Sequence, residues 1–222
     1  MKPEIADQLN KGGPDFRCTG IRGAQFMVEA TSFEPDKVTK DTSIENELSP
    51  GLRGQAYAFL TRQLEEKAGA KRRQFEQLQC PGILAIASSH IGSSLVLDAD
   101  AANNALISQP FWVGNEEGMS TDLASSLFLH LEDNGEITGR NQSISAVLLV
   151  SVGEDRSYVC GALNPAATQK FESESLWMVP FVYLKDWPIE GRDLRCEWTM
   201  GSTHSYAVEH KAIRASKPGS GK

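Results

Sequence analysis

Alternating apolar and polar positions near the start of the chain predict a β-hairpin. Phe16–Thr31 contains short segments rich in Phe, Val, Ile and Thr, which Gly20 and Gly23 separate. Segments of this kind on either side of turn residues are typical of two antiparallel strands. We therefore expect the chain to reverse near Arg22.

A long helix is predicted after this hairpin. Gly54–Gln79 is rich in Ala, Leu, Glu, Lys, Arg and Gln, which favour helices. We expect the helix to end before Pro81, because proline has no backbone N–H with which to continue it. At about 100° per residue, its apolar residues form one stripe, made of Leu60, Leu64, Phe75 and Leu78.

Polar side chains interrupt this stripe, since Lys67, Lys71 and Gln74 fall within the same arc of the helix. Two interpretations remain open. In the first, the lysines extend their ammonium groups to solvent from a half-buried face. In the second, one of them points at an acidic site on the sheet, where it neutralises charge and stabilises charge that develops on a phosphate oxygen.

The rest of the chain contains further apolar segments and one more helix. We expect a strand buried on both faces at Ile83–Ser88, a helix at Asp98–Ile107, an antiparallel pair at Ile144–Val152 and Ser157–Leu163, and further strands at Leu176–Leu184 and Cys196–Met200. This order predicts an α/β fold, with a mixed sheet flanked by helices and an additional β-rich C-terminal part.

The length of 222 residues suits one α/β domain, or a core with an extended second half. Residues 1–90 bear the candidate site described below, and residues 91–215 are the remainder of the same domain or a β-rich extension. The tail at 216–222 is low in complexity and is expected to be disordered.

The sequence predicts a protein of the cytoplasm. Its longest apolar runs are too short to span a bilayer, and Met1–Gly13 has no apolar segment of a signal peptide. Cys18, Cys80, Cys160 and Cys196 lie far apart in the sequence, which favours free thiols over a zinc site or disulfides.

The net charge of −7 does not favour binding of nucleic acid by the protein as a whole, because affinity for DNA comes from cationic side chains that contact phosphates. The charge is uneven, however, and the long helix carries a basic cluster made of Arg62, Lys67, Lys71, Arg72 and Arg73. Such a cluster is either solvated surface or a face for nucleic acid, with DNA the expected form.

Asp15 and Glu29 are candidates for a metal site. With the hairpin centred near Arg22, the two residues face each other directly, with Cβ atoms about 4.5–5.5 Å apart. Two carboxylates this close repel each other unless a cation or a proton lies between them. Mg²⁺, or Mn²⁺ in its place, binds such oxygen ligands. A turn shifted by one residue would instead put them on opposite faces of the sheet.

These residues together resemble a known family. Pro14-Asp15, then Glu29-Ala30-Thr31, then a lysine-bearing helix that leads into Pro81-Gly82-Ile83, is similar to the PD-(D/E)xK nuclease superfamily. The similarity is greatest to uncharacterised bacterial members with a PDF and E-A-T pattern, and it covers about residues 4–90. It implies a restriction-endonuclease-like fold.

The resemblance also implies roles. Asp15 and Glu29 would be catalytic acids that bind the metal, and Glu4 would match an acid that the family often carries on a preceding helix. The family lysine should stand two residues after the second acid, where this chain has Thr31. Lys67, or else Lys71, would be the migrated catalytic lysine, with Gln74 in support.

Three functional hypotheses follow. The first is a metal-dependent nuclease that hydrolyses phosphodiester bonds in DNA, in which the bound metal lowers the pKa of a water molecule. The second is a nuclease-derived module that binds nucleic acid or protein without catalysis, because Thr31 replaces the lysine. The third is an unrelated α/β protein in which the motif is a coincidence.

Overall fold

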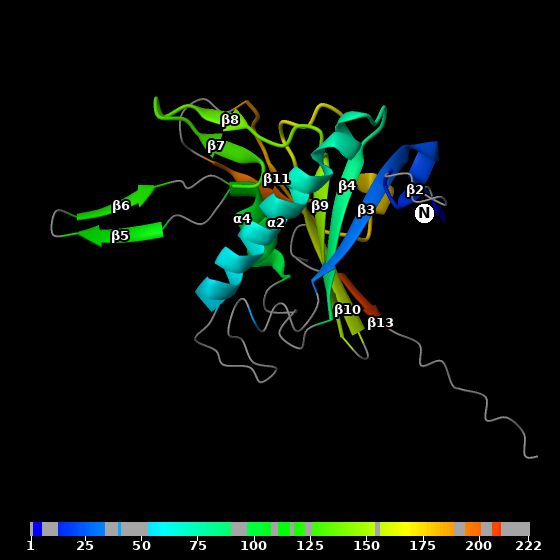
Figure 1. Ribbon diagram of the computed structural model, residues 1–222, viewed down its shortest axis with the longest axis horizontal. Coiled ribbons are helices and arrows are strands. Elements are labelled where there is room, and N and C mark those ends of the chain that lie inside the picture. The colour runs from blue at the N-terminus through cyan, green and yellow to red at the C-terminus, as the bar shows by residue number, and fades with distance from the viewer. Residues whose placement is uncertain are drawn as a thin grey trace, which may run out of the picture.

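A mixed β-sheet forms the centre of the protein (Figure 1). The computed structural model describes residues 2–5, 13–33, 40, 53–89, 97–107, 111–115, 118–122, 126–153, 156–188, 194–200 and 206–209. Within this part of the chain, the sheet strands are β1 (Lys2–Ile5), β2 (Phe16–Thr19), β3 (Gln25–Phe33), β4 (Gly82–Ser88), β9 (Ala146–Val152), β10 (Arg156–Leu163), β11 (Phe181–Leu184), β12 (Cys196–Trp198) and β13 (Tyr206–Glu209).

The sheet has the order β1-β2-β3-β4-β9-β10-β11-β12, and β13 pairs with β10 as well. Strand β2 is antiparallel to both β1 and β3, and β4 is parallel to both β3 and β9. Helix α2 (Arg53–Glu76) connects β3 to β4. Because these two strands are parallel, α2 runs in the opposite direction to them. Strands from both halves of the chain therefore belong to one sheet.

The described part of the chain contains smaller elements as well. They include helix α4 (Ala99–Ile107) and the short 3-10 helices η1 (Ile21–Gly23) and η3 (Ser173–Leu176). Two small antiparallel strand pairs are also present. These pairs are β5 (Phe111–Asn115) with β6 (Gly118–Asp122), and β7 (Leu129–Leu131) with β8 (Ile137–Gly139). No helix among the described residues is long and apolar enough to cross a membrane.

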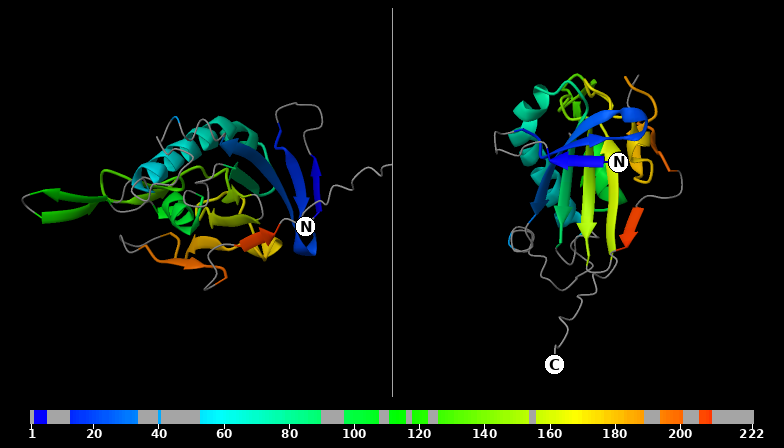
Figure 2. Two further views of the ribbon diagram at one scale, coloured as in Figure 1. Left: turned by 90° about the horizontal axis from the view of Figure 1, so that it is seen from below. Right: turned by 90° about the vertical axis from the view of Figure 1, so that its right-hand side faces the viewer.

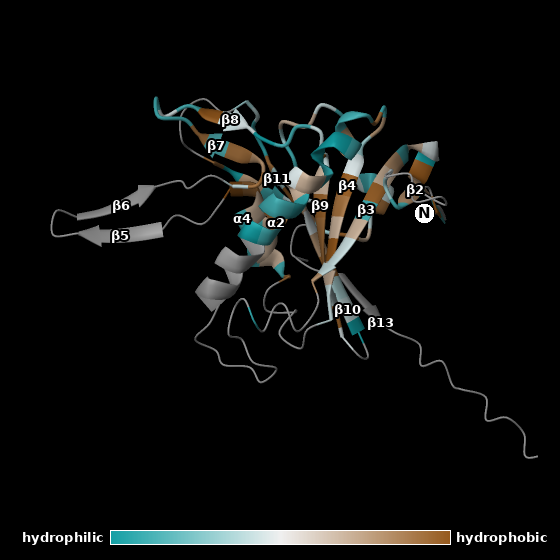
Figure 3. Ribbon diagram, viewed as in Figure 1, coloured by the Kyte–Doolittle hydropathy of each residue, from teal (hydrophilic) through white to brown (hydrophobic). Residues whose placement is uncertain are grey.

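The sheet buries apolar side chains on both faces. Leu84 and Ile86 belong to a cluster with residues of α2 and α4, whereas Ile83 faces the other way, toward Phe26 and Phe171. Figure 3 shows hydrophobic residues along β4 and β9, as expected for central strands. Figure 2 shows α2 alongside the sheet and β1 to β3 at one end of it. The candidate acids lie at that end.

The predicted hairpin and long helix are confirmed. Strands β2 and β3 pair antiparallel, with Arg17 opposite Met27, so the hairpin is centred at Arg22. Arg22 itself adopts a positive φ of 60° within η1. Helix α2 ends at Glu76, before the proline. Of its predicted stripe, Leu64 and Phe75 are buried and Leu78 is partly buried. The side chain of Leu60 lies outside the described residues, as does the 216–222 tail.

The predicted second helix and later strands are also present, with one correction. Asp98 caps α4 by accepting a hydrogen bond from the Ala101 N–H at 3.0 Å. Strands β9 and β10 form the predicted antiparallel pair. The strand predicted at Leu176–Leu184 begins only at Phe181, because Leu176 ends η3 and its carbonyl closes a turn with the Val179 N–H at 2.7 Å.

Asn164 holds the segment that precedes β9. Its side chain, in a residue only 4% exposed, donates to the carbonyls of Arg140, Asn141 and Ile144 at 3.2, 3.0 and 2.9 Å. Its Oδ1 accepts from the Ala166 N–H at 3.0 Å. This one amide therefore links residues 140–144 to the turn after β10.

Replacing Asn164 with alanine should lower the free energy of unfolding by roughly 2 kcal/mol, because several carbonyls and one N–H lose their partner. Urea unfolding of wild type and Asn164→Ala measures this difference. Asn164→Asp keeps an acceptor for Ala166 but loses the donors, so we expect it to be destabilised as well. A wild-type midpoint for both variants would contradict this role.

Candidate functional site

The structure brings Asp15 and Glu29 to adjacent strands. Phe16 pairs with Val28, and extending this register by one pair places Asp15, which directly precedes β2, opposite Glu29 on β3. Val28 belongs to the cluster on the far face, so Glu29, its neighbour, points to the face that α2 covers. Asp15 points to the same face, because directly opposed residues share one.

The Asp15 carboxylate is held in place by the backbone of the neighbouring strand. Its Oδ2 accepts a hydrogen bond from the Ala30 N–H at 2.8 Å. Asp15 is half-buried, and the preceding Pro14, whose ring restricts the chain, is buried. One carboxylate oxygen is thus fixed against β3, next to Glu29.

Glu29 is buried, at 3% exposure, and its charge is balanced by a lysine of α2. The Lys71 Nζ forms an ion pair with Glu29 Oε1, and the Lys71 side chain remains 32% exposed. A buried carboxylate without a counter-charge is strongly unfavourable. The lysine that interrupts the apolar stripe is therefore explained by an acid on the facing strand.

One buried oxygen of this acid and one on the same face of α2 have no hydrogen-bond partner within the described residues. They are Glu29 Oε2 and Gln74 Oε1. Gln74 follows Lys71 by three residues, so the two lie on neighbouring positions of the same helix face. Both atoms accept and neither can donate, so each lacks a donor or a cation. This is the clearest sign of an incomplete site.

The ion pair with Glu29 comes from Lys71 and not from Lys67. Among the described residues, no ion pair joins Lys67 to Asp15 or Glu29. Lys67 lies four residues before Lys71, which is about 6 Å along the helix axis. Thr31 lies two residues after Glu29, which is about 6.6 Å along the strand. Since α2 and β3 run in opposite directions, Lys67 lies at the level of Thr31. Its catalytic role stays a prediction, and Lys71 is the lysine at the acid.

The sequence pattern missed Gln63, which is buried at the same side of α2. It precedes Lys67 by four residues, and its Nε2 donates to Glu66 Oε2 at 3.1 Å. Together with Lys67, Lys71 and Gln74 it forms a polar row along the helix. The signal was present in the sequence, because Gln63 falls within the same arc of the helix as the lysines.

The basic residues of α2 do not form the single face that the sequence predicted. Lys71 points to Glu29, whereas Arg72, about 100° further around the helix, pairs with Glu76 at 2.7 Å. Arg62 lies near Glu66, at 3.9 Å. Arg73 lies another 100° or so beyond Arg72. The cations therefore point in several directions, and acidic side chains on the same helix partly balance them.

The role implied for Glu4 needs correction as well. Glu4 lies on strand β1, opposite Arg17 of β2, and not on a helix. All four residues of β1 pair with β2, so the described part of this segment is an extended strand. Glu4 therefore does not correspond to an acid carried on a helix.

A metal ion at this site would have few protein ligands. Among the described residues, no group of three or more His, Cys, Asp or Glu side chains is placed to hold an ion. Asp15 and Glu29 provide two carboxylates, and Gln74 Oε1 is a further oxygen. Mg²⁺ commonly binds through one or two carboxylates and completes its shell with water and substrate phosphates. The donor set fits that kind of ion.

The cysteines do not offer an alternative catalytic group. All four are free thiols. Burial raises the pKa of the Cys160 thiol to about 12 and that of Cys196 to about 11, so both are neutral at pH 7. Burial also raises the pKa of Cys18 and of Cys80. A nucleophilic thiol needs a lowered pKa, and the shifts here have the opposite sign.

Comparisons of the chain with models of protein families, with curated proteins and with solved structures found no match.

Proposed function

We propose that the protein is a metal-dependent nuclease of the PD-(D/E)xK type that hydrolyses phosphodiester bonds in nucleic acid, with DNA the expected substrate. In this proposal the mixed sheet is a restriction-endonuclease-like core. The observation that carries it is the opposition of Asp15 and Glu29 across β2 and β3, with Lys71 on Glu29. The unpartnered Glu29 Oε2 supports it further.

Asp15 and Glu29 would hold Mg²⁺, and Mn²⁺ would serve in its place. When bound, such an ion lowers the pKa of a coordinated water and stabilises negative charge on the phosphate. Glu29 would contribute Oε2, because Oε1 is engaged by Lys71. Asp15 would contribute Oδ1, since Oδ2 accepts the Ala30 N–H.

The two lysines of α2 would act through their positions and their positive charges. Lys71 neutralises the second acid, so that a substrate phosphate meets less negative charge than two carboxylates would present. Its side chain is one-third exposed and so remains accessible to a substrate. Lys67, at the level of Thr31, would take the place that the family lysine has in the motif and neutralise charge on the phosphate oxygen.

A second candidate is a nuclease-derived module that binds nucleic acid or protein without cutting. Two observations favour it. Thr31 stands in the lysine slot of the motif, and Lys71 already forms an ion pair with the buried Glu29. In this case the ion pair only stabilises the fold.

The proposal predicts cleavage that requires a divalent ion. Purified full-length protein should cut labelled duplex DNA, single-stranded DNA or RNA with Mg²⁺ or Mn²⁺, and EDTA should abolish the cleavage. Gel analysis of the three substrates with each ion measures this. Binding without cleavage under any of these conditions would favour the second candidate. The absence of both binding and cleavage would contradict the two together.

A further inference from the structure

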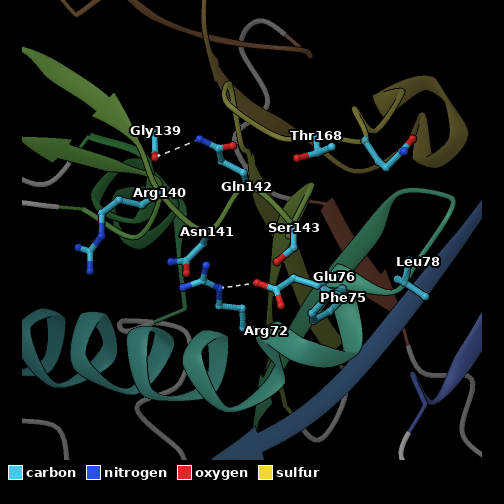
Figure 4. A pocket seen from close by; sticks show the side chains of 11 residues that line it. Arg72, Phe75, Glu76, Leu78, Gly139, Arg140, Asn141, Gln142, Ser143 and Thr168 are labelled. Atoms are coloured by element: carbon cyan, nitrogen blue, oxygen red, sulfur yellow. Dashed lines mark hydrogen bonds and ion pairs between the residues drawn. The ribbon is translucent and has the colours of Figure 1, made fainter.

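A cavity of about 580 Å³ lies beside the C-terminal end of α2 (Figure 4). The last turns of the helix form one wall, and the segments at 139–143 and 168–169 form the other. Its polar lining includes Arg72, Glu76, Gln142, Ser143 and Thr168. These side chains come from three separate parts of the sequence, which the fold brings together.

Arg72 provides a positioned positive charge. Its Nε donates to Glu76 Oε1 at 2.7 Å, one turn further along the helix. The two terminal nitrogens of the guanidinium group have no partner within the described residues. Figure 4 shows this group extending from the helix toward the loop that carries Asn141 and Ser143. Glu76 thus orients Arg72 and leaves its paired N–H donors available.

The opposite wall offers donors that the protein does not use. Ser143 Oγ is buried and has no hydrogen-bond partner. The backbone N–H groups of Gln142 and Ser143 also have no acceptor among the described residues. The Thr168 hydroxyl lies beside them, and the Thr168 N–H donates to the Gln142 carbonyl at 2.8 Å. A buried hydroxyl without a partner is costly unless a ligand or water supplies one.

This wall is held in shape before any ligand binds. Asn164 fixes the carbonyls of residues 140, 141 and 144. Asn141 adopts a positive φ of 47°, and its amide donates to the Leu127 carbonyl at 2.8 Å. Arg140 also lines the cavity, but its guanidinium group points away from Arg72 in Figure 4, and it pairs with Glu65 at 3.3 Å. The backbone of this wall is therefore preformed, and a rotation of the buried Ser143 hydroxyl toward the cavity is the rearrangement that binding requires.

We propose that this cavity binds a phosphate group. The free terminal N–H pair of the Arg72 guanidinium, a buried hydroxyl and neighbouring backbone N–H groups together match a tetrahedral oxyanion. A cation would face the arginine, and an apolar ligand would leave these donors without partners. The site does not depend on the proposed nuclease activity, because Arg72 and Lys71 point about 100° apart around α2.

The phosphate has two possible sources, a free or terminal phosphate and a phosphodiester within a nucleic-acid chain. A titration of isotope-labelled full-length protein with sodium phosphate, followed by amide NMR at constant ionic strength, tests the shared chemistry. We expect the amide signals of Gln142, Ser143 and Thr168 to shift, and a sodium chloride titration to leave them in place.

Arg72→Gln should weaken phosphate binding at least roughly tenfold, because it removes a charge-assisted pair of hydrogen bonds. Arg72 is 65% exposed, so its replacement should not disturb the fold. Arg73→Gln is the matched control, since Arg73 is the next residue, is exposed and does not line the cavity. Ser143→Ala should weaken binding roughly tenfold as well.

A dinucleotide with and without a 5′-phosphate then identifies the source. Binding of both forms assigns the site to the phosphodiester, and binding of the phosphorylated form alone assigns it to a terminal or free phosphate. Either result supports the site if Arg72→Gln removes it. The proposal would be overturned if Arg72→Gln and Arg73→Gln lost phosphate affinity equally. It would also be overturned if phosphate did not shift the amide signals of Gln142, Ser143 and Thr168.

Discussion

Replacing Asp15 with asparagine should reduce divalent-ion-dependent cleavage about 1,000-fold, since the metal's contribution is several kcal/mol and each 1.36 kcal/mol is tenfold in rate. Asparagine has nearly the same shape as aspartate but lacks its charge, so an ion held by Asp15 and Glu29 would lose one of its two carboxylates. Cleavage rates of wild type and Asp15→Asn at a series of Mg²⁺ concentrations measure the effect.

This substitution separates chemistry from folding. The asparagine carbonyl can still accept the hydrogen bond from the Ala30 N–H, so we expect the free energy of unfolding to change by less than about 1 kcal/mol. Asp133→Asn is the matched control, because Asp133 is an exposed acid in the turn between β7 and β8. If Asp15→Asn cut at the wild-type rate, Asp15 would not belong to the active site.

Replacing Lys71 with methionine should destabilise the protein by roughly 2–3 kcal/mol, somewhat less than the 3–5 kcal/mol found when a fully buried pair loses one partner. Glu29 would then be a buried carboxylate with no positive partner. The value is below the full range because the Lys71 side chain is one-third exposed, so water screens the pair. Urea unfolding measures the loss.

Lys67→Met is the matched control for this experiment. Lys67 lies one turn earlier on the same helix and makes no ion pair with Glu29, so its loss should cost less than about 0.5 kcal/mol. Adding Glu29→Gln to Lys71→Met should restore part of the stability, because the amide removes the unpaired charge. If the two lysine variants were equally stable, the ion pair would contribute nothing to the fold.

Some features of the candidate site follow from the order of residues alone. The positions of Gly20 and Gly23 predicted a turn near Arg22, and the strand pairing confirms the register that sets Asp15 against Glu29. The regularity of a helix was enough to show that Lys67 and Lys71 share its buried face. These are local properties, since short stretches of chain determine strand pairing across a tight turn and the angle between helical residues.

Other features required the tertiary structure. The sequence could not show which lysine forms the ion pair with Glu29, because this depends on the position of α2 along the axis of β3. That position is decided by the packing of Leu64 and Phe75 against the strands below. Strand β1 was not foreseen either, because a four-residue strand is stabilised by pairing with β2 and not by its own pattern.

The sequence by itself therefore determined the hairpin, the long helix and the two lysines on its apolar stripe, and it left two registers open for Asp15 and Glu29. Only the fold decided that Lys71 forms the ion pair, that Glu29 is buried with an oxygen left over, and that Arg72, Ser143 and Thr168 surround one cavity. The physical reason is the range of the interactions. Helix and hairpin geometry act over a few residues, whereas burial and the meeting of distant side chains depend on how the whole sheet packs.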